Sequence, residues 1–234
     1  MWDNAALLRH VANALIAASV LALLSGAAYY AIHLPGLFPL RSVRLSEMPQ
    51  RVEASAVLQV VRSEVHGNFF TVDIDHLRES LEKLPWVRNV SVRREFPQHL
   101  VVELEEHHAL ARWNESALVN RQGEVFEANS TQVLPSFIGP EDTSMEMTQH
   151  YAQFSQQLAM LHLQVTQLVL SPRYAWQLRL NNGVVLELGR EEIQQRVARF
   201  VAGYPYSEMA LQGAPVKYVD LRYRNGFAVR VGHG

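Results

Sequence analysis

The stretch VANALIAASVLALLSGAAYYAI, residues 11–32, contains no charged side chain and decides the architecture of the chain. Only Asn13, Ser19 and Ser25 in it are polar. A helix rises about 1.5 Å per residue, so one of this length extends about 33 Å, enough to cross the roughly 30 Å hydrocarbon core of a bilayer. We therefore predict a membrane-spanning helix over residues 11–32, with most of the chain following it.

Two other structures could account for such an apolar stretch. A cleaved signal peptide has an apolar core of roughly 7–15 residues, which is shorter than this one, although Ser25, Gly26 and Ala27 are small residues of the kind found at cleavage sites. The other is a buried helix of a soluble domain, but helices of soluble domains usually show a polar face, and none is present here. Length therefore favours an uncleaved signal anchor.

One face of the predicted anchor carries only small residues, because Ala14, Ala18, Ala22 and Gly26 follow one another at steps of four. Small side chains on one face allow a second membrane helix to approach closely. The same pattern is expected when alanine is simply abundant, so both interpretations stay open.

Composition excludes several classes of function. The net charge of −2 gives no basic field for nucleic acid, and the absence of cysteine excludes disulfides, thiolate zinc sites, iron–sulfur clusters and a cysteine nucleophile. His107 and His108 are adjacent, so in a strand they would face opposite ways and could not share a metal ion. The sequence has no P-loop or Gly-x-Ser-x-Gly motif. We expect no catalytic residue, no metal, no cofactor and no small-molecule substrate.

Residues 38–108 show the pattern strand, helix, helix, strand, strand. Apolar and polar residues alternate around Val43 and around Val102, which indicates strands. Apolar residues recur at helical spacing after Val57 and after Leu77, which indicates helices. Two helices on one face of a small sheet bury an α+β core.

Residues 109–234 predict a second α+β domain, in which two helices pack on a mainly antiparallel sheet. Helical stripes begin at Met147 and Ile193, and Asn182-Gly183 between two apolar runs is the best hairpin signal in the chain. The last two strands are predicted over residues 216–223 and 227–231. A final strand often lies at a sheet edge, where its unpaired backbone can bind an incoming strand.

Several motifs follow one another along almost the whole chain. They are Gly67-Asn68-Phe69-Phe70-x-Val72-Asp73, Leu84-Pro85-Trp86-Val87, Arg94-x-Phe96-Pro97, Gly123-Glu124-Val125-Phe126 and Tyr218-Val219-Asp220-Leu221-Arg222-Tyr223-x-Asn225-Gly226. In this order they resemble a POTRA domain and, more narrowly, the FtsQ/DivIB family of bacterial cell-division proteins.

The resemblance implies a single-pass type II protein of the bacterial inner membrane, located at the division septum. Residues 1–10 would be cytoplasmic, residues 11–32 the anchor and residues 33–37 a linker. A POTRA domain over residues 38–108 and a β domain over residues 109–234 would lie in the periplasm. The Lys/Arg distribution around the anchor does not decide this orientation.

The resemblance also implies a non-catalytic scaffold that links early and late division proteins. It would help to control septal peptidoglycan synthesis by binding the FtsB/FtsL pair through its last strands. The expected contact residues are Arg222, Tyr223, Asn225, Gly226, Phe227 and Tyr174. Two alternatives of other classes are a POTRA-bearing translocation component, which would need an attached barrel of many strands, and a membrane-anchored periplasmic hydrolase.

Overall fold

The computed structural model describes residues 5–34, 36–210 and 214–232. The expected cytoplasmic segment and linker therefore fall partly outside the described residues, at positions 1–4 and 35. The chain divides into two compact units, with the boundary between Glu106 and His107.

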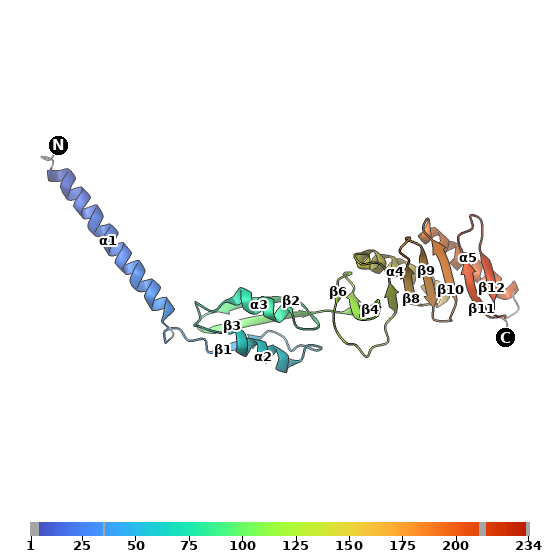
Figure 1. The fold of residues 1–234 in the computed structure, drawn as a ribbon, viewed down its shortest axis with the longest axis horizontal. Helices are drawn as coiled ribbons and strands as arrows, with labels where there is room; N and C mark the ends of the chain where they lie inside the picture. Colours follow the sequence, from blue (N-terminus) through green and yellow to red (C-terminus); the bar gives the residue numbers. More distant parts are fainter. Residues whose placement is uncertain (1–4, 35, 211–213, 233–234) are drawn as a thin grey trace. The chain divides into compact units, whose positions relative to one another are not determined.

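The first element is a single long helix, α1 (Ala5–His33) (Figure 1). It is apolar enough over Leu7–His33 to cross a membrane, and none of its described side chains is buried. Exposing so much apolar surface to water would be unfavourable. The helix therefore fits a single-pass membrane anchor. Ala14, Ala18, Ala22 and Gly26 are all exposed on it, and a Cβ on Gly26 would meet no atom within 4 Å.

The rest of the first unit has the element order that the sequence predicts. Its sheet has the order β1-β3-β2, with β1 parallel to β3 and β2 antiparallel to it. The two helices bury Val57, Leu77 and Leu81 in one core with Leu100 and Val102 of the central strand. The elements are β1 (Ser42–Leu45), α2 (Ala54–Glu64), α3 (Ile74–Glu82), β2 (Val87–Glu95) and β3 (His99–Glu106).

Helix α3 is capped by Asp73, because its carboxylate accepts a hydrogen bond of 3.0 Å from the backbone N–H of His76. Asp75 lies in the first turn, where a negative charge favours the helix.

The second unit contains a nine-stranded mixed sheet in the order β12-β11-β10-β9-β8-β7-β4-β5-β6. Three neighbouring pairs are parallel, namely β4/β7, β7/β8 and β10/β11, and the remaining pairs are antiparallel. The fold class α+β is therefore confirmed. The elements are β4 (Ala109–Trp113), β5 (Ala117–Asn120), β6 (Val125–Phe126), β7 (Ser136–Ile138), α4 (Ser144–Leu158), η1 (Ala159–Leu161), β8 (Val165–Leu170), β9 (Trp176–Leu180), β10 (Val185–Gly189), α5 (Ile193–Ala210), β11 (Val216–Asp220) and β12 (Ala228–Val231).

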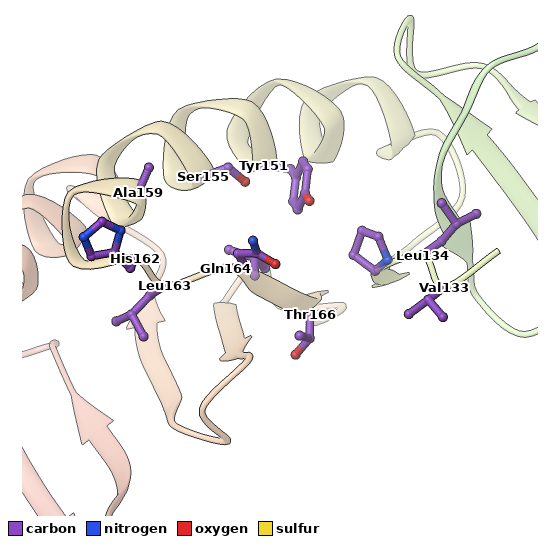
Figure 2. Close-up of a pocket in the computed structure, with 11 residues that line it drawn as sticks. Val133, Leu134, Tyr151, Ser155, Ala159, His162, Leu163, Gln164 and Thr166 are labelled. Atoms are coloured by element: carbon purple, nitrogen blue, oxygen red, sulfur yellow. The ribbon is translucent and has the colours of Figure 1, made fainter.

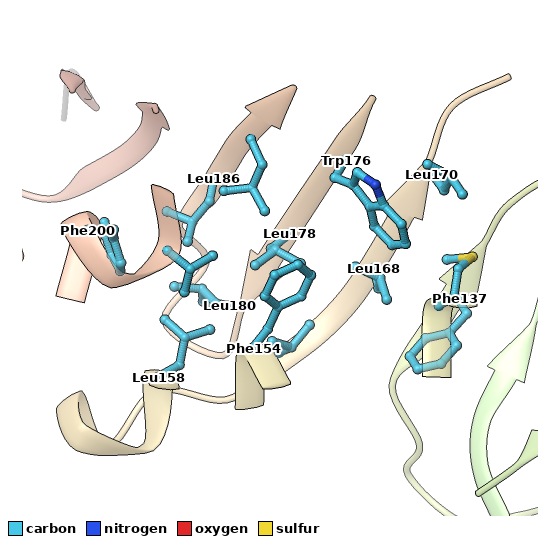
Figure 3. Close-up of a cluster of buried hydrophobic side chains, with 14 of the residues drawn as sticks. Phe137, Phe154, Leu158, Leu168, Leu170, Trp176, Leu178, Leu180, Leu186 and Phe200 are labelled. Carbon is cyan, nitrogen blue, oxygen red and sulfur yellow. The ribbon is translucent and has the colours of Figure 1, made fainter. Parts of the chain in front are cut away.

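Both helices contribute to one core on the sheet. Phe154 and Leu158 of α4 and Phe200 of α5 are fully buried, and Figure 3 shows them beside Leu178 and Leu186 of the strands. The sheet and the two helices therefore share a single apolar layer.

The predicted hairpin at Asn182-Gly183 is present. The N–H of Gly183 donates to the carbonyl of Leu180 at 3.0 Å, and the N–H of Leu180 donates to the carbonyl of Val184 at 2.9 Å. Gly183 has a φ of +84°, a conformation that glycine adopts without strain.

Candidate protein-interaction edge

Strand β12 forms one edge of the nine-stranded sheet. It pairs antiparallel with β11, with Val219 opposite Val229 and Asp220 opposite Ala228, and no other strand among the described residues pairs with it. In an antiparallel edge strand about half of the residues direct their N–H and C=O groups away from the neighbouring strand. This edge can therefore accept a further strand through backbone hydrogen bonds.

The two last strands are shorter than the sequence suggests. Strand β11 ends at Asp220 and β12 begins at Ala228, so residues 221–227 form a loop. Leu221 is still buried, and its N–H donates to the carbonyl of Glu187 at 2.9 Å. Immediately after it the backbone N–H of Arg222 donates to the carboxylate of Asp220 at 3.0 Å, which turns the chain out of the sheet. Strand alternation therefore does not decide where Arg222 and Tyr223 point.

Arg222 and Asp220 form a two-bond ion pair at the beginning of this loop. Nε of Arg222 donates to Oδ1 at 2.9 Å and Nη2 donates to Oδ2 at 2.7 Å. The hydrogen bond from Arg222 holds the pKa of the Asp220 carboxyl below its usual value, and the same bond raises the pKa of Arg222. The Arg222 side chain remains 57% exposed, so its guanidinium is fixed in direction but still accessible.

Arg199 of α5 holds the rest of the loop. Its Nη1 donates to the carbonyl of Tyr223 at 2.5 Å and lies 3.4 Å from the carbonyl of Gly226. Tyr223 is 58% exposed and Asn225 is also exposed. The backbone of the loop is therefore tied to α5 while the Tyr223 ring is left on the surface.

Phe227 occupies a different environment from the other predicted contact residues. Its ring is half-buried, packs against the core and lies 6.2 Å from the ring of Phe200. A Cβ built on Gly203 of α5 would lie only 2.8 Å from Cε1 of Phe227. Phe227 therefore fixes the end of the loop on α5, and only part of its ring is open to a partner.

Tyr174 lies in the tight turn between β8 and β9, where its N–H donates to the carbonyl of Ser171 at 2.8 Å. The side chain is 53% exposed. Gly189 of β10 pairs with Trp176, and Glu187 of β10 pairs with Asp220, so this turn lies at the same end of the sheet as the loop 221–227. Two strand spacings of about 4.8 Å separate β9 from β11, which places all six predicted residues at one end of the sheet.

Three residues that shape this site were missed by sequence reasoning. Asp220 could have been found, because opposite charges at positions i and i+2 share one face of an extended chain. Arg199 and Gly203 gave no local signal, since their roles depend on how α5 crosses the sheet.

Features elsewhere in the second unit do not point to catalysis. Within the described ranges no three His, Cys, Asp or Glu side chains are grouped so that they could hold a metal ion. His107 is buried, stacks on Phe126 at 4.0 Å between ring centres and lies 3.0 Å from the amide of Asn120, whereas His108 is exposed. The histidine pair therefore does not act as one site.

A cavity of about 620 Å³ opens between α4, η1 and the start of β8 (Figure 2). Its polar side chains are those of Tyr151, Ser155, His162, Gln164 and Thr166, and no carboxylate is among the described residues that line it. A pair of carboxylates for hydrolysis is thus not formed there.

Comparisons with known proteins agree with this architecture. The family model "Cell division protein FtsQ/DivIB, C-terminal" matches residues 111–222, and the model "POTRA domain, FtsQ-type" matches residues 38–107. The chain is 44% identical to the cell division protein FtsQ of Nitrosospira multiformis, over 98% of this chain and 99% of that protein. It is 41% identical to that of Burkholderia pseudomallei, over 98% and 94%, and 39% identical to that of Escherichia coli, over 70% and 62%.

Proposed function

Because the chain belongs to the FtsQ/DivIB family of cell-division proteins, we propose that it is a non-catalytic scaffold of the divisome. In this role it binds the FtsB/FtsL pair through β12 and the loop 221–227. It thereby links early and late division proteins and helps to control septal peptidoglycan synthesis.

The topology is part of the same proposal. Helix α1 crosses the inner membrane once, with the N-terminal residues in the cytoplasm and with the POTRA domain, residues 38–108, and the β domain, residues 109–234, in the periplasm at the septum. The unburied apolar surface of α1 supports a membrane span, and the family supports its orientation. A reporter that is active only in the periplasm, fused after the β domain, tests it.

The observation that carries the proposed binding mode is the open edge of β12. A partner segment that adds a strand there gains backbone hydrogen bonds, and nearby side chains give the pairing its specificity. The β12 residues alternate between exposed and half-buried, so an added strand would continue the pattern of the sheet.

The loop 221–227 supports this binding mode because hydrogen bonds within the domain hold its backbone and the Arg222 side chain. Asp220 fixes the guanidinium of Arg222, and Arg199 fixes the backbone at Tyr223. A surface that is already ordered loses less conformational entropy on binding. Tyrosine and arginine are also the residue types that most often dominate interface energies.

The experiment that tests the site is photocrosslinking in dividing cells. A benzophenone amino acid replaces Tyr223, and the same amino acid at Tyr206 is the matched control, since Tyr206 is 71% exposed on α5 but outside the proposed site. We expect FtsB to be captured from position 223 and not from position 206. Equal capture from the two positions, or no capture of FtsB from position 223, would refute the site.

A further inference from the structure

Three phenylalanine rings are exposed on the first unit. The exposed fractions are 41% for Phe38, 44% for Phe70 and 80% for Phe96, and Leu37 beside Phe38 is 44% exposed. The rings of Phe38 and Phe70 lie 5.0 Å apart, edge to face. We call Leu37, Phe38, Phe70 and Phe96 the aromatic tip.

Backbone contacts bring these residues to one end of the small sheet. The N–H of Phe69 donates to the carbonyl of Phe38 at 2.9 Å, which joins the turn at Phe70 to the segment before β1. Phe96 lies in the turn between β2 and β3, and Gln98 in the same turn accepts a bond of 2.9 Å from the N–H of Arg41. The aromatic tip is therefore the end of the domain at which β1 begins.

The same end is tied to the end of α1. Asn68 is only 1% exposed, and its Nδ2 donates to the carbonyls of Ile32 at 2.6 Å and Leu34 at 3.3 Å. Phe38 follows the last residue of α1, His33, by five positions, and such a segment spans at most roughly 17 Å. The phenylalanine rings are therefore held close to the point where the helix leaves the bilayer.

The polar backbone around Phe70 is already bonded within the protein. The N–H groups of Phe70 and Thr71 donate to Oδ1 of Asn68 at 2.9 and 3.0 Å. The carbonyls of Phe69 and Val72 accept from Arg94 of β2 at 2.9 and 2.8 Å. Unpaired backbone groups are costly outside water, so a turn that inserts into lipid needs this internal pairing.

We propose that the aromatic tip is a second membrane contact, which docks the POTRA domain on the bilayer surface from which α1 emerges. The occupant is lipid because the surface continues directly from the membrane helix, whose exposed Tyr29 and Tyr30 mark its interfacial end. The exposed Arg41 next to the tip favours anionic headgroups. An interfacial apolar surface is buried by roughly 5–10 Å at the boundary of headgroups and acyl chains.

The absence of cysteine allows a direct test on the full chain. The variant Phe96→Cys, labelled with an environment-sensitive fluorophore, is reconstituted into phosphatidylcholine/phosphatidylglycerol vesicles that contain lipids with a shallow nitroxide quencher. Met48→Cys is the matched control, because Met48 is 86% exposed and follows the far end of β1. Leu24→Cys within α1 confirms that the helix has inserted.

We expect quenching at position 96 to exceed that at position 48 by about twofold or more, since only the former site would reach the headgroup region. Replacing Phe38 and Phe70 together with serine should reduce the quenching at position 96 toward the control value. Quenching at position 24 together with equal, weak quenching at positions 96 and 48 would overturn the proposal. No division partner is present, so this result is independent of the proposed binding to FtsB.

Discussion

Arg199 of α5 and Tyr223 of the loop 221–227 are joined by a hydrogen bond of 2.5 Å from Nη1 to the backbone carbonyl. The bond uses no atom of the Tyr223 side chain, so the helix orders the loop and leaves the ring on the surface. The order of the loop and the chemistry of the exposed ring can therefore be changed separately by mutation.

The variant Arg199→Ala should loosen the loop without unfolding the domain. Residues 222–226 would lose their tie to α5, so their amides should exchange faster with solvent. Affinity for FtsB should fall roughly tenfold, about 1.4 kcal/mol, because the loop must then be ordered on binding. Hydrogen exchange and titration calorimetry measure the two effects. Arg190→Ala, at another exposed arginine, is the control, and unchanged exchange in Arg199→Ala would contradict the role of the bond.

The variant Tyr223→Ala should weaken FtsB binding by ~2 kcal/mol, as expected for an aromatic anchor at an interface. The thermal midpoint should change little, since the ring is 58% exposed. Tyr206→Ala removes a ring that is even more exposed, at 71%, and this variant should bind FtsB normally. Phe227→Ala, added to Tyr223→Ala, should abolish binding and septation, but it should also lower stability, because Phe227 packs on the core. Normal FtsB capture by the double variant would refute the site.

The ion pair of Asp220 and Arg222 predicts how the loop responds to pH. The folded pKa of Asp220 lies below the unfolded value of about 3.9, so the pair stabilises the fold above that pH and loses this effect as pH falls through the folded pKa. Loop amide shifts in NMR spectra should stay constant from about pH 5 to 8 and change only below about pH 4. Asp220→Asn should remove the transition, and a transition near neutral pH would contradict the assignment.

The variant Gly203→Ala should destabilise the second unit. A glycine-to-alanine change inside a helix normally stabilises by roughly 0.5–1 kcal/mol. Here the new Cβ would overlap the ring of Phe227, and overpacking of this kind costs about 1–3 kcal/mol. Denaturant unfolding measures whether the free energy of unfolding rises or falls. Gly226→Ala is the control, because a Cβ at Gly226 would meet no atom within 4 Å. In the background of Phe227→Ala, the cost of Gly203→Ala should largely disappear.

The small-residue face of α1 stays a prediction with its own test. Replacing Ala18 and Ala22 with isoleucine should reduce copurification of a membrane partner, since bulky side chains prevent close helix approach. Ala17→Ile combined with Ala27→Ile is the matched control, because at about 100° per residue both positions lie off that face. Equal copurification of the two double variants would show that the face has no partner.

Much of the fold could be predicted because its signals are local. Examples are the apolar run of α1, the order of elements in the POTRA domain and the Asn182-Gly183 hairpin. Each is recognised from residues that lie close together in the sequence. Periodicity and turn chemistry describe such features well.

Two details of the interaction edge differ from the prediction, one because of a hydrogen bond between near neighbours and one because of contacts between distant residues. Strand propensity continues through Tyr223, yet β11 ends at Asp220, where the carboxylate captures Arg222. Phenylalanine is a residue type often found at interfaces, but α5 crosses the sheet so that the ring of Phe227 packs toward Phe200. A local hydrogen bond from the backbone to a side chain overrides strand propensity at the first point, and tertiary packing decides the second.

The parallel pairing of β10 with β11 has a consequence for how the second unit is assembled. Residues 190–215, which include α5, separate these two strands, so the pairing of β11 with β10 needs a long crossover, whereas β9 and β10 close as a local hairpin. Until that crossover is complete, β10 is itself a bare edge with Leu186 and Leu188 unshielded. A chain that has not completed this crossover is therefore open to aggregation through the edge of β10.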